Sequence, residues 1–255
     1  MLLRIGFQGG VPPWQEFEDS VLKEGGSMEL SKRLELVASL VTHDTIADIG
    51  TDHGYVPIYL YLQGKIKKAY ACDVRKGPLE KCRQNIALHG AENAIETRLG
   101  SGLMPLRPFE AETAIMAGMG GMLIVHILQD SPEVAESLKE LVLSPQRDFG
   151  EVRKYLHEIG FAIQEEHMLK EDNKPYVVMR CKKEEEKYDR EIDYLYGKKL
   201  LEKKEPLLKE LLLHEEGKYS RLFEKLKNNP TENAQKRLSE VEEKLALMRE
   251  ALACL

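Results

Sequence analysis

Short apolar runs alternate with amphipathic segments along most of this chain. Seven such runs predict strands, at residues 45–49, 68–72, 95–99, 113–116, 140–143, 162–165 and 176–181. Between them, segments with helical character predict helices near 55–62, 77–89, 121–129, 132–138 and 148–159. Repeated strand–helix units indicate an α/β fold with a Rossmann-like, mostly parallel sheet of seven strands, helices on both faces and an antiparallel hairpin at its end.

The beginning of the chain differs from this alternating middle. Residues 1–27 contain paired glycines and prolines and show no period, so we expect a disordered or non-native extension. The segment 23–26 (Lys-Glu-Gly-Gly) is what a ribosome-binding tract would encode if translated, and it lies just before Met28. Our hypothesis is that the natural protein starts at Met28, where a helical pattern over 30–41 begins.

The end of the chain differs as well. Residues 182–187 are charged and carry no apolar side chain, which predicts a domain boundary, so that 28–182 and 183–255 form separate domains. A helical stretch over 188–226 is interrupted at Pro206 and Gly217. After a turn at 228–231, apolar residues step alternately by four and three, at Ala234, Leu238, Val241, Leu245, Met248 and Leu252. We therefore predict a helical coiled-coil hairpin over 183–255.

Composition and charge narrow the class of protein. The formal net charge of −6 argues against a generic nucleic-acid binder, although Lys65, Lys67, Lys68, Arg75 and Lys76 could form a local basic face. No apolar run approaches the roughly 20 residues of a membrane span, and no secretory signal is visible. The four cysteines follow no paired spacing that would indicate disulfides or a metal site. We expect a cytoplasmic protein without membrane contact or bound metal.

The candidate chemistry is concentrated where the first predicted strand ends. Residues 48–54 read Asp-Ile-Gly-Thr-Asp-His-Gly, so Gly50 and Gly54 let the backbone approach a ligand beyond the strand. A dinucleotide fold requires three glycines and a helix N-terminus that receives a pyrophosphate. The carboxylates of Asp48 and Asp52 would repel a pyrophosphate. They suit a cationic ligand with a ribose and an amine, such as S-adenosylmethionine.

Three further loops follow the next strands of the predicted sheet. Asp73 ends the second strand, where an acid accepts hydrogen bonds from a ribose diol; a turn aspartate is the alternative. Ser101 and Gly102 follow the third strand and are candidates for contact with adenine, unless they form a simple turn. Three glycines, Gly118, Gly120 and Gly121, follow the fourth strand and indicate close backbone approach to a ligand or tight helix packing.

The loop after the fifth strand carries side chains that suit RNA. Gln146 can read the edge of a base, and Arg147 can bind a phosphate. The alternative is that this loop serves only the following helix, with Asp148 as its N-cap.

Together these motifs resemble one family. The segments 47–57, Asp73-Val74, Gly77-Pro78, 98–100 and 117–121 are similar to those of the bacterial tRNA (adenine-22 N1)-methyltransferase family, TrmK. The likeness covers residues 28–181, and the helical tail resembles the C-terminal coiled coil of that family. Two positions depart from its pattern, with Ser101 in place of an acid and 144–146 (Ser-Pro-Gln) in place of Gln-Pro-Asn.

The resemblance implies a class I methyltransferase that transfers a methyl group from S-adenosylmethionine to N1 of adenine 22 in the D-arm of tRNA. Asp52 is the candidate for stabilising the positive charge that develops on the ring, with His53 and Tyr55 beside it; the alternative for His53 is a structural imidazole. The expected cofactor-binding residues are Asp48, Gly50, Thr51, Gly54, Asp73, Val74, Ser101, Gly102, Gly118, Met119 and Gly120. The expected substrate-binding residues are Gly121, Gln146 and Arg147. We expect a monomer whose tail binds tRNA.

Two other classes of function stay open. The chain could be a class I methyltransferase that acts on another RNA or on a small molecule. It could also be a non-catalytic Rossmann domain that assembles partners through the coiled coil. The combination of Asp48, Gly50, Gly54 and Asp73 argues against the second alternative, because a scaffold does not need a complete ligand site.

Overall fold

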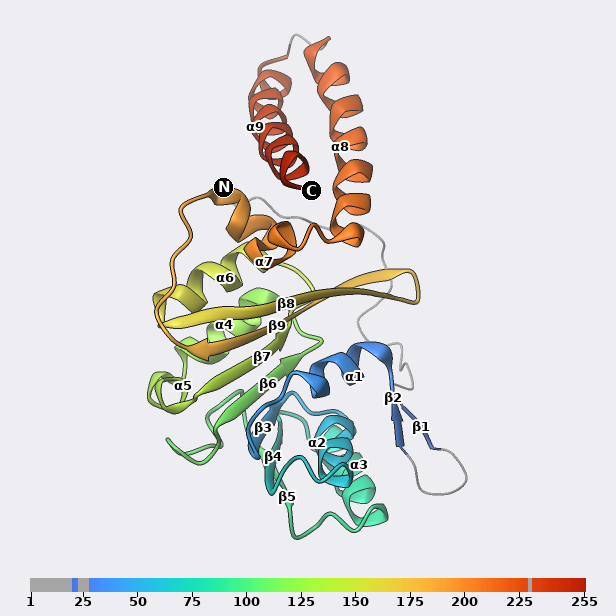
Figure 1. Ribbon diagram of the computed structural model, residues 1–255, viewed down its shortest axis with the longest axis vertical. Helices are drawn as coiled ribbons and strands as arrows, with labels where there is room; N and C mark the ends of the chain where they lie inside the picture. The colour runs from blue at the N-terminus through green and yellow to red at the C-terminus, as the bar shows by residue number, and fades with distance from the viewer. Residues whose placement is uncertain (1–19, 23–27, 229–230) are drawn as a thin grey trace. The chain divides into compact units, whose positions relative to one another are not determined.

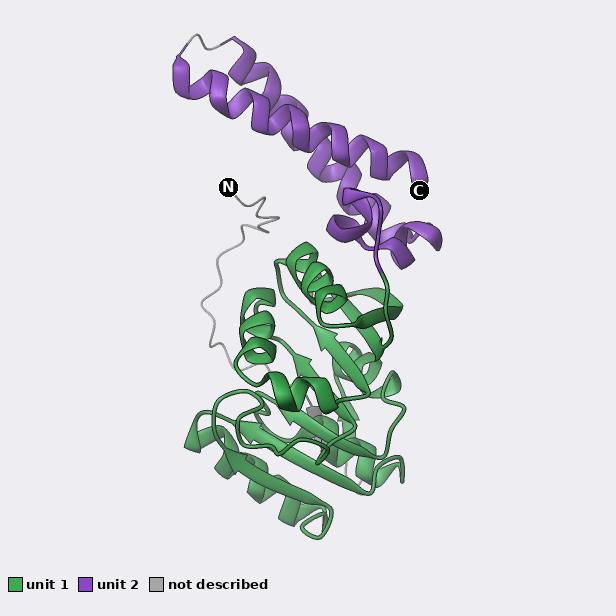
Figure 2. Cartoon of the chain, turned by 90° about the vertical axis from the view of Figure 1, so that its left-hand side faces the viewer, with its two compact units in different colours: residues 1–186 green, residues 187–255 purple. Residues whose placement is uncertain are grey.

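The computed structural model describes residues 20–22, 28–228 and 231–255 (Figure 1). The chain forms two compact units, Met1–Glu186 and Lys187–Leu255 (Figure 2). The predicted extension over 1–27 lies outside the described residues except for strand β1 (Ser20–Leu22), which pairs antiparallel with β2 (Met28–Leu30).

In the described part of the first unit, seven strands form one sheet in the order β5-β4-β3-β6-β7-β9-β8. The first five strands of this order are parallel, and β9 and β8 form an antiparallel hairpin at one edge. The strands are β3 (Thr45–Ile49), β4 (Lys68–Asp73), β5 (Ile95–Leu99), β6 (Thr113–Ala117), β7 (Glu140–Ser144), β8 (Phe161–Glu171) and β9 (Lys174–Lys183). The predicted mostly parallel sheet with a closing hairpin is confirmed.

The β8–β9 hairpin is longer than predicted. Its strands pair as far as Glu171 and Lys174, and Asp172 and Asn173 form the turn between them with φ of 48° and 61°. Asp and Asn are among the residues that accept positive φ in two-residue hairpin turns, and such turns match the twist of paired strands. Residues near the tip of the hairpin are mixed polar and apolar, so no apolar run in the sequence predicts this extension.

Helices cover both faces of the sheet because the central strands are apolar on both sides. In β7, Leu141 and Leu143 belong to one buried cluster, whereas Val142 between them belongs to the other. Each fully buried side chain of this size contributes roughly 1.5–3 kcal/mol to folding. Most buried residues of α1 (Lys32–Ser39), α2 (Tyr55–Leu62) and α3 (Lys76–Leu88) lie in one cluster. Most buried residues of α4 (Gly121–Gln129), α5 (Pro132–Ser137) and α6 (Phe149–Glu158) lie in the other.

The strand order places a topological switch point between β3 and β6. The chain leaves β3 for α2 on one face of the sheet and leaves β6 for α4 on the opposite face. Ligands of open α/β sheets bind outside the carboxyl ends of strands at such a point. The glycine-rich segments after β3 and β6 are therefore at the expected place for a site.

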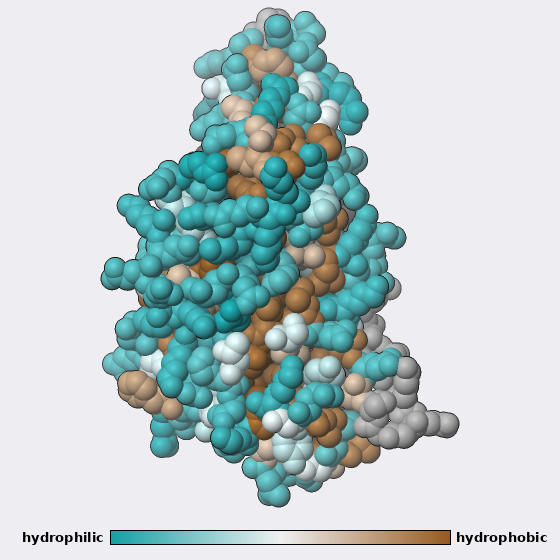
Figure 3. All heavy atoms as spheres, viewed as in Figure 1, coloured by the Kyte–Doolittle hydropathy of each residue, from teal (hydrophilic) through white to brown (hydrophobic). Residues whose placement is uncertain are grey.

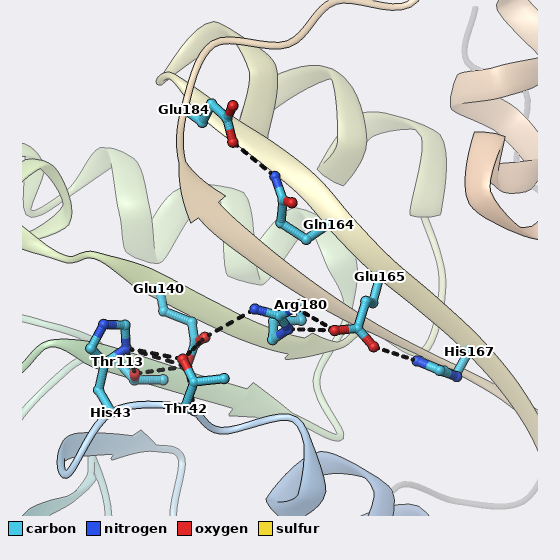
Figure 4. A network of polar contacts seen from close by, with 9 residues as sticks. All are labelled: Thr42, His43, Thr113, Glu140, Gln164, Glu165, His167, Arg180 and Glu184. Carbon is cyan, nitrogen blue, oxygen red and sulfur yellow. Dashed lines mark hydrogen bonds and ion pairs between the residues drawn. The ribbon is translucent and has the colours of Figure 1, made fainter.

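The amino end of the same strands holds a buried polar network (Figure 4). The carboxylate of Glu140 is fully buried and accepts hydrogen bonds from Thr42 N at 3.0 Å, Thr42 Oγ1 at 2.6 Å and Thr113 Oγ1 at 2.9 Å. Arg180 of β9 lies 3.7 Å from Glu140 and also pairs with Glu165 of β8. A buried charge is tolerated only when it is paired and hydrogen-bonded. This network joins the hairpin to the parallel strands at the edge opposite the glycine-rich turns.

The second unit contains the π-helix η1 (Asp193–Gly197) and helices α7 (Lys198–Glu202), α8 (Pro206–Lys227) and α9 (Glu232–Cys254). The break predicted at Pro206 is confirmed, since α8 begins there. The break predicted at Gly217 is wrong, because α8 continues through it. One glycine costs a helix only about 1 kcal/mol relative to alanine, which the other positions of a 22-residue helix readily offset.

Helices α8 and α9 pack along each other, as the predicted hairpin requires. Four positions of the predicted seam are buried, at Ala234, Val241, Leu245 and Met248, while Leu238 and Leu252 are partly exposed. The seam also buries Lys244, whose Nζ lies 2.5 Å from Tyr219 Oη and 4.1 Å from the centre of its ring. A long lysine stem can cover apolar surface while its ammonium reaches a polar or aromatic partner, which accounts for a charge in this position.

Candidate active site

The turn from β3 to α2 is fixed by backbone hydrogen bonds and by two glycines. The N–H groups of Gly50 and Thr51 donate to the carbonyl oxygen of Cys72, at 2.8 and 3.0 Å. Gly50 and Gly54 have φ of +77° and +73°, in the left-handed region that side chains disfavour. A Cβ on Gly54 would also lie 2.6 Å from Cys82 Sγ of α3. The sequence therefore requires glycine at both places, and the turn is held against the end of β4.

Two acidic side chains lie at the ends of the adjacent strands β3 and β4. Asp48 is 9% exposed and Asp73 is 6% exposed. Burial raises the pKa of Asp48 to about 6; the charge of Asp73 acts in the same direction, and the Thr51 side chain opposes the rise. Asp73 accepts a hydrogen bond from Arg75 N at 2.7 Å, which fixes the orientation of its carboxylate. Without a ligand, the ionised form of Asp48 is therefore disfavoured. A cationic ligand beside it would favour the ionised form.

Asp52, His53 and Tyr55 come together at the start of α2. His53 Nε2 lies 3.5 Å from Asp52 Oδ2, and the rings of His53 and Tyr55 are stacked with centres 4.9 Å apart and planes 7° from parallel. The side chain of Asp52 is 64% exposed, so it faces solvent. Asn85 of α3 donates to the carbonyl oxygen of His53 at 2.9 Å. The sequence pattern did not identify Asn85, because it lies within an ordinary amphipathic helix.

The glycine loop after β6 is bound to the segment after β7. Gly118 N donates to the carbonyl oxygen of Ser144 at 3.0 Å, and Gln146 N donates to that of Met119 at 3.0 Å. Gly118 has a φ of +83°. These bonds place the loop 118–121 beside Gln146, and both side chains predicted to bind substrate after β7, Gln146 and Arg147, are exposed there.

Gly121 has a packing reason for its lack of a side chain. Its N–H donates to the carbonyl oxygen of Arg147 at 3.1 Å, and a Cβ there would lie 2.4 Å from that oxygen. Gly50 and Met119 are also neighbours, since a Cβ on Gly50 would lie 3.0 Å from Met119 Cε. The first and fourth turns of the parallel sheet therefore meet, with Met119 between them.

The remaining predicted cofactor positions lie at the ends of β4 and β5. Val74, which directly follows the buried Asp73, is 66% exposed. Gly100 N donates to the carbonyl oxygen of Asp73 at 3.0 Å, so the loop that carries Ser101 and Gly102 is tied to the end of β4. Ser101 is exposed, and Gly102 packs against Ile127 of α4. An exposed apolar side chain beside this loop is suited to contact a planar ring.

Arg33 of α1 also reaches the glycine loop, and no sequence motif indicates this contact. A Cβ on Gly118 would lie 3.3 Å from Arg33 Nη1. The guanidinium of Arg33 lies over the ring of Tyr176 in β9, with Cζ 5.3 Å from the ring centre. The contact joins segments far apart in the chain, so no local spacing could predict it.

Other kinds of site find less support. In the residues that the structure describes, no three His, Cys, Asp or Glu side chains lie close enough to hold a metal ion. Within the same ranges, no helix combines the length and apolar character needed to cross a bilayer. The face of the molecule seen in Figure 3 is mainly hydrophilic, with hydrophobic side chains gathered in smaller areas.

Comparison with known proteins shows the family to which the chain is similar. Residues 30–179 match the family model described as a methyltransferase domain. The chain is 35% identical over 153 residues to the tRNA (adenine(22)-N(1))-methyltransferase of Bacillus subtilis, an alignment that covers 60% of this chain and 64% of that protein.

A solved structure matches a larger part of this chain. Sp1610 of Streptococcus pneumoniae, a proposed tRNA (m1A22) methyltransferase, superimposes with a TM-score of 0.80 at 31% identity, over 88% of this chain and 100% of that chain. The same protein in complex with S-adenosyl-L-methionine superimposes with a TM-score of 0.75 at 30% identity, over the same shares of the two chains.

Proposed function

The chain belongs to the methyltransferase-domain family and, within it, to the tRNA (adenine-22 N1)-methyltransferases, TrmK, and from this premise we propose that it transfers a methyl group from S-adenosylmethionine to N1 of adenine 22 in tRNA. The observation that carries the proposal is the pair of buried acids, Asp48 and Asp73, at the carboxyl ends of the adjacent strands β3 and β4. We further propose that it acts in the cytoplasm as a monomer.

The residues at the turns fit this cofactor. Asp73, oriented by its bond to Arg75 N, would accept hydrogen bonds from the ribose hydroxyls. Asp48 is a buried carboxylate with a raised pKa and lies where a cationic ligand would restore the charged form. Gly50, Gly54 and Gly118 adopt the positive φ that the turns around the site require, and exposed Val74 would cover one face of the adenine. When bound, S-adenosylmethionine supplies a methyl group activated by the sulfonium charge.

The residues at the start of α2 would then lie beside the adenine that accepts the methyl group. N1 of neutral adenine carries a lone pair, so no strong base is required, but methylation leaves the ring positively charged. The exposed carboxylate of Asp52 can stabilise that charge as it develops. His53 lies against Asp52 and stacks on Tyr55, so it would hold the carboxylate and the ring of Tyr55 in place. We propose that these three residues form the catalytic group.

Binding of tRNA needs a larger surface than this site. Exposed Lys218, Arg221 and Lys225 follow one another at helical spacing along α8 and form a basic row. Such a row binds phosphates without regard to sequence and positions an RNA. We propose that the row, and Gln146 and Arg147 near the glycine loop, contact the tRNA. The target base must be extruded from the stacked arm, at a cost of a few kcal/mol.

A direct test uses an unmodified tRNA transcript that carries adenine at position 22 and a matched transcript that carries guanine there. We expect methyl transfer from S-adenosylmethionine to the first transcript and none to the second. Equal transfer to both would move the target to another base. Transfer only to ribosomal RNA or a small molecule would support the alternative enzyme, and a calorimetric titration without heat of binding for the cofactor would support the scaffold.

A further inference from the structure

Two arginines lie against the glycine loop 118–121 from different parts of the sheet. Arg33 comes from α1, and a Cβ on Gly118 would lie 3.3 Å from its Nη1. Arg147 comes from the segment after β7, and a Cβ on Gly120 would lie 3.3 Å from its Nε. Glycine at these two positions therefore allows two guanidinium groups to approach one backbone loop.

The position of Arg33 is set by rigid elements. Helix α1 begins after Ser31, whose Oγ accepts a hydrogen bond from Leu34 N at 3.3 Å, and its apolar side packs into the core through Leu34, Val37 and Ala38. The guanidinium lies over the ring of Tyr176, which pairs with Leu169 across the β8–β9 hairpin. A guanidinium that lies over an aromatic ring is attracted to it, and its planar fork can bind a phosphate by two hydrogen bonds.

The charges around the loop are mostly divided by sign, with Asp148 as the exception, since its Oδ2 lies 3.4 Å from Arg147 Nε. Asp48 and Asp73 are buried at the ends of β3 and β4, where they suit a cation and repel a phosphate. Arg33 of α1 and Arg147, which follows β7, both lie against the loop after β6, on the neighbouring side of the switch point. A target nucleotide that presents its base toward a cofactor held by these acids would have its phosphates near the arginines.

We propose that Arg33 is a positioning residue that binds a phosphate next to the target nucleotide of the RNA, with Tyr176 holding its guanidinium in place. The inference rests on the proposed function and deepens it, because it identifies a contact for the acceptor that lies outside the sequence motifs. Arg147, on the other side of the loop, would bind a second phosphate. The extruded base is thereby held by its backbone on both sides.

The test compares Arg33→Ala and Arg33→Lys with Lys32→Ala, which removes a positive charge from the exposed neighbouring position of α1. Binding of an unmodified tRNA transcript, methylation kinetics and the dissociation constant for S-adenosylmethionine are measured for each protein. We expect Arg33→Ala to weaken tRNA binding about tenfold, with cofactor affinity within about twofold of the original. Because one phosphate contact is lost, the slope of tRNA affinity against salt concentration should fall by about one.

The two control variants separate positioning from folding. Arg33→Lys should recover part of the tRNA affinity, since it keeps the charge and loses the planar fork. Lys32→Ala should change tRNA binding by less than about twofold. Equal tRNA affinity and equal salt slopes in Arg33→Ala and Lys32→Ala would overturn the proposal. If Arg33→Ala does not fold, equal binding by Arg33→Lys and the original protein at every salt concentration would overturn it.

The outcomes also separate this inference from the proposed function. Absence of methyl transfer by the original protein would refute the function. A tenfold loss of tRNA binding in Arg33→Ala would still support the phosphate contact in that case, because binding is measured independently of turnover.

Discussion

Replacing Asp48 by asparagine should stabilise the protein while it weakens the cofactor site. The folded protein raises the pKa of this carboxyl from 3.8 to about 6, chiefly by burial. At about 1.4 kcal/mol per pKa unit, ionised Asp48 destabilises the fold at pH 7.5 by up to about 3 kcal/mol relative to its protonated form. Asparagine cannot ionise, so Asp48→Asn should recover part of that free energy in the absence of ligand.

The stabilising effect of Asp48→Asn should depend on pH. A carboxyl whose pKa is raised on folding favours the folded state below pH 3.8, and this contribution is lost as the pH rises through about 6. The advantage of Asp48→Asn should therefore be largest at pH 7.5 and should fall to roughly half at pH 5. We expect the free energy of unfolding of this unit to rise by about 1–3 kcal/mol. Each kcal/mol should raise its melting temperature by roughly 2–4 °C.

Differential scanning calorimetry with and without S-adenosylmethionine measures the melting temperature and the cofactor affinity. The relevant melting transition is the one that moves when S-adenosylmethionine is added. The variant should melt higher than the original protein at pH 7.5, and its cofactor dissociation constant should rise at least about tenfold. Glu92→Gln, which removes an exposed acid of the same unit, should change neither quantity. A folded Asp48→Asn protein that melts no higher than the original at pH 7.5, or that binds the cofactor equally well, would refute the reasoning.

Three other changes test separate parts of the site. Asp52→Ala should lower kcat on the order of 100-fold while cofactor affinity changes less than about threefold, and equal losses would make Asp52 a cofactor ligand only. Replacing Lys218, Arg221 and Lys225 together by alanine should raise KM for tRNA at least about tenfold in steady-state kinetics, whereas an unchanged KM would remove α8 from the RNA surface. Gly54→Ala should lower the free energy of unfolding by at least about 1 kcal/mol in denaturant titrations, because its φ is +73° and a Cβ would meet a thiol of α3; an unchanged midpoint would contradict the strained turn.

Local pattern predicted the elements well where apolar character is continuous. The strand at 45–49 begins and ends as predicted, because its side chains are buried on both faces and the turn at Gly50 marks its end. The outer half of the β8–β9 hairpin and the passage of α8 through Gly217 were missed, since both depend on contacts with a neighbouring segment. Cross-strand pairing and helix packing can override a single unfavourable residue.

The candidate site divides in the same way. The sequence alone places the turns that follow predicted strands at one edge of the sheet, because parallel strands end together. The sequence does not predict contacts that come from outside these turns. Examples are the contact of Arg33 with Gly118 and the hydrogen bond from Asn85 to His53. Each comes from a helix whose sequence shows only an amphipathic period, and the order of the strands brings it to the site.

The most direct measurement is a pair of calorimetric titrations of the original protein, one with S-adenosylmethionine and one with NAD. Because buried acids at the first glycine turn favour a cation and repel a pyrophosphate, S-adenosylmethionine should bind and NAD should give no heat of binding. Binding of NAD without binding of S-adenosylmethionine would contradict the assignment of the site.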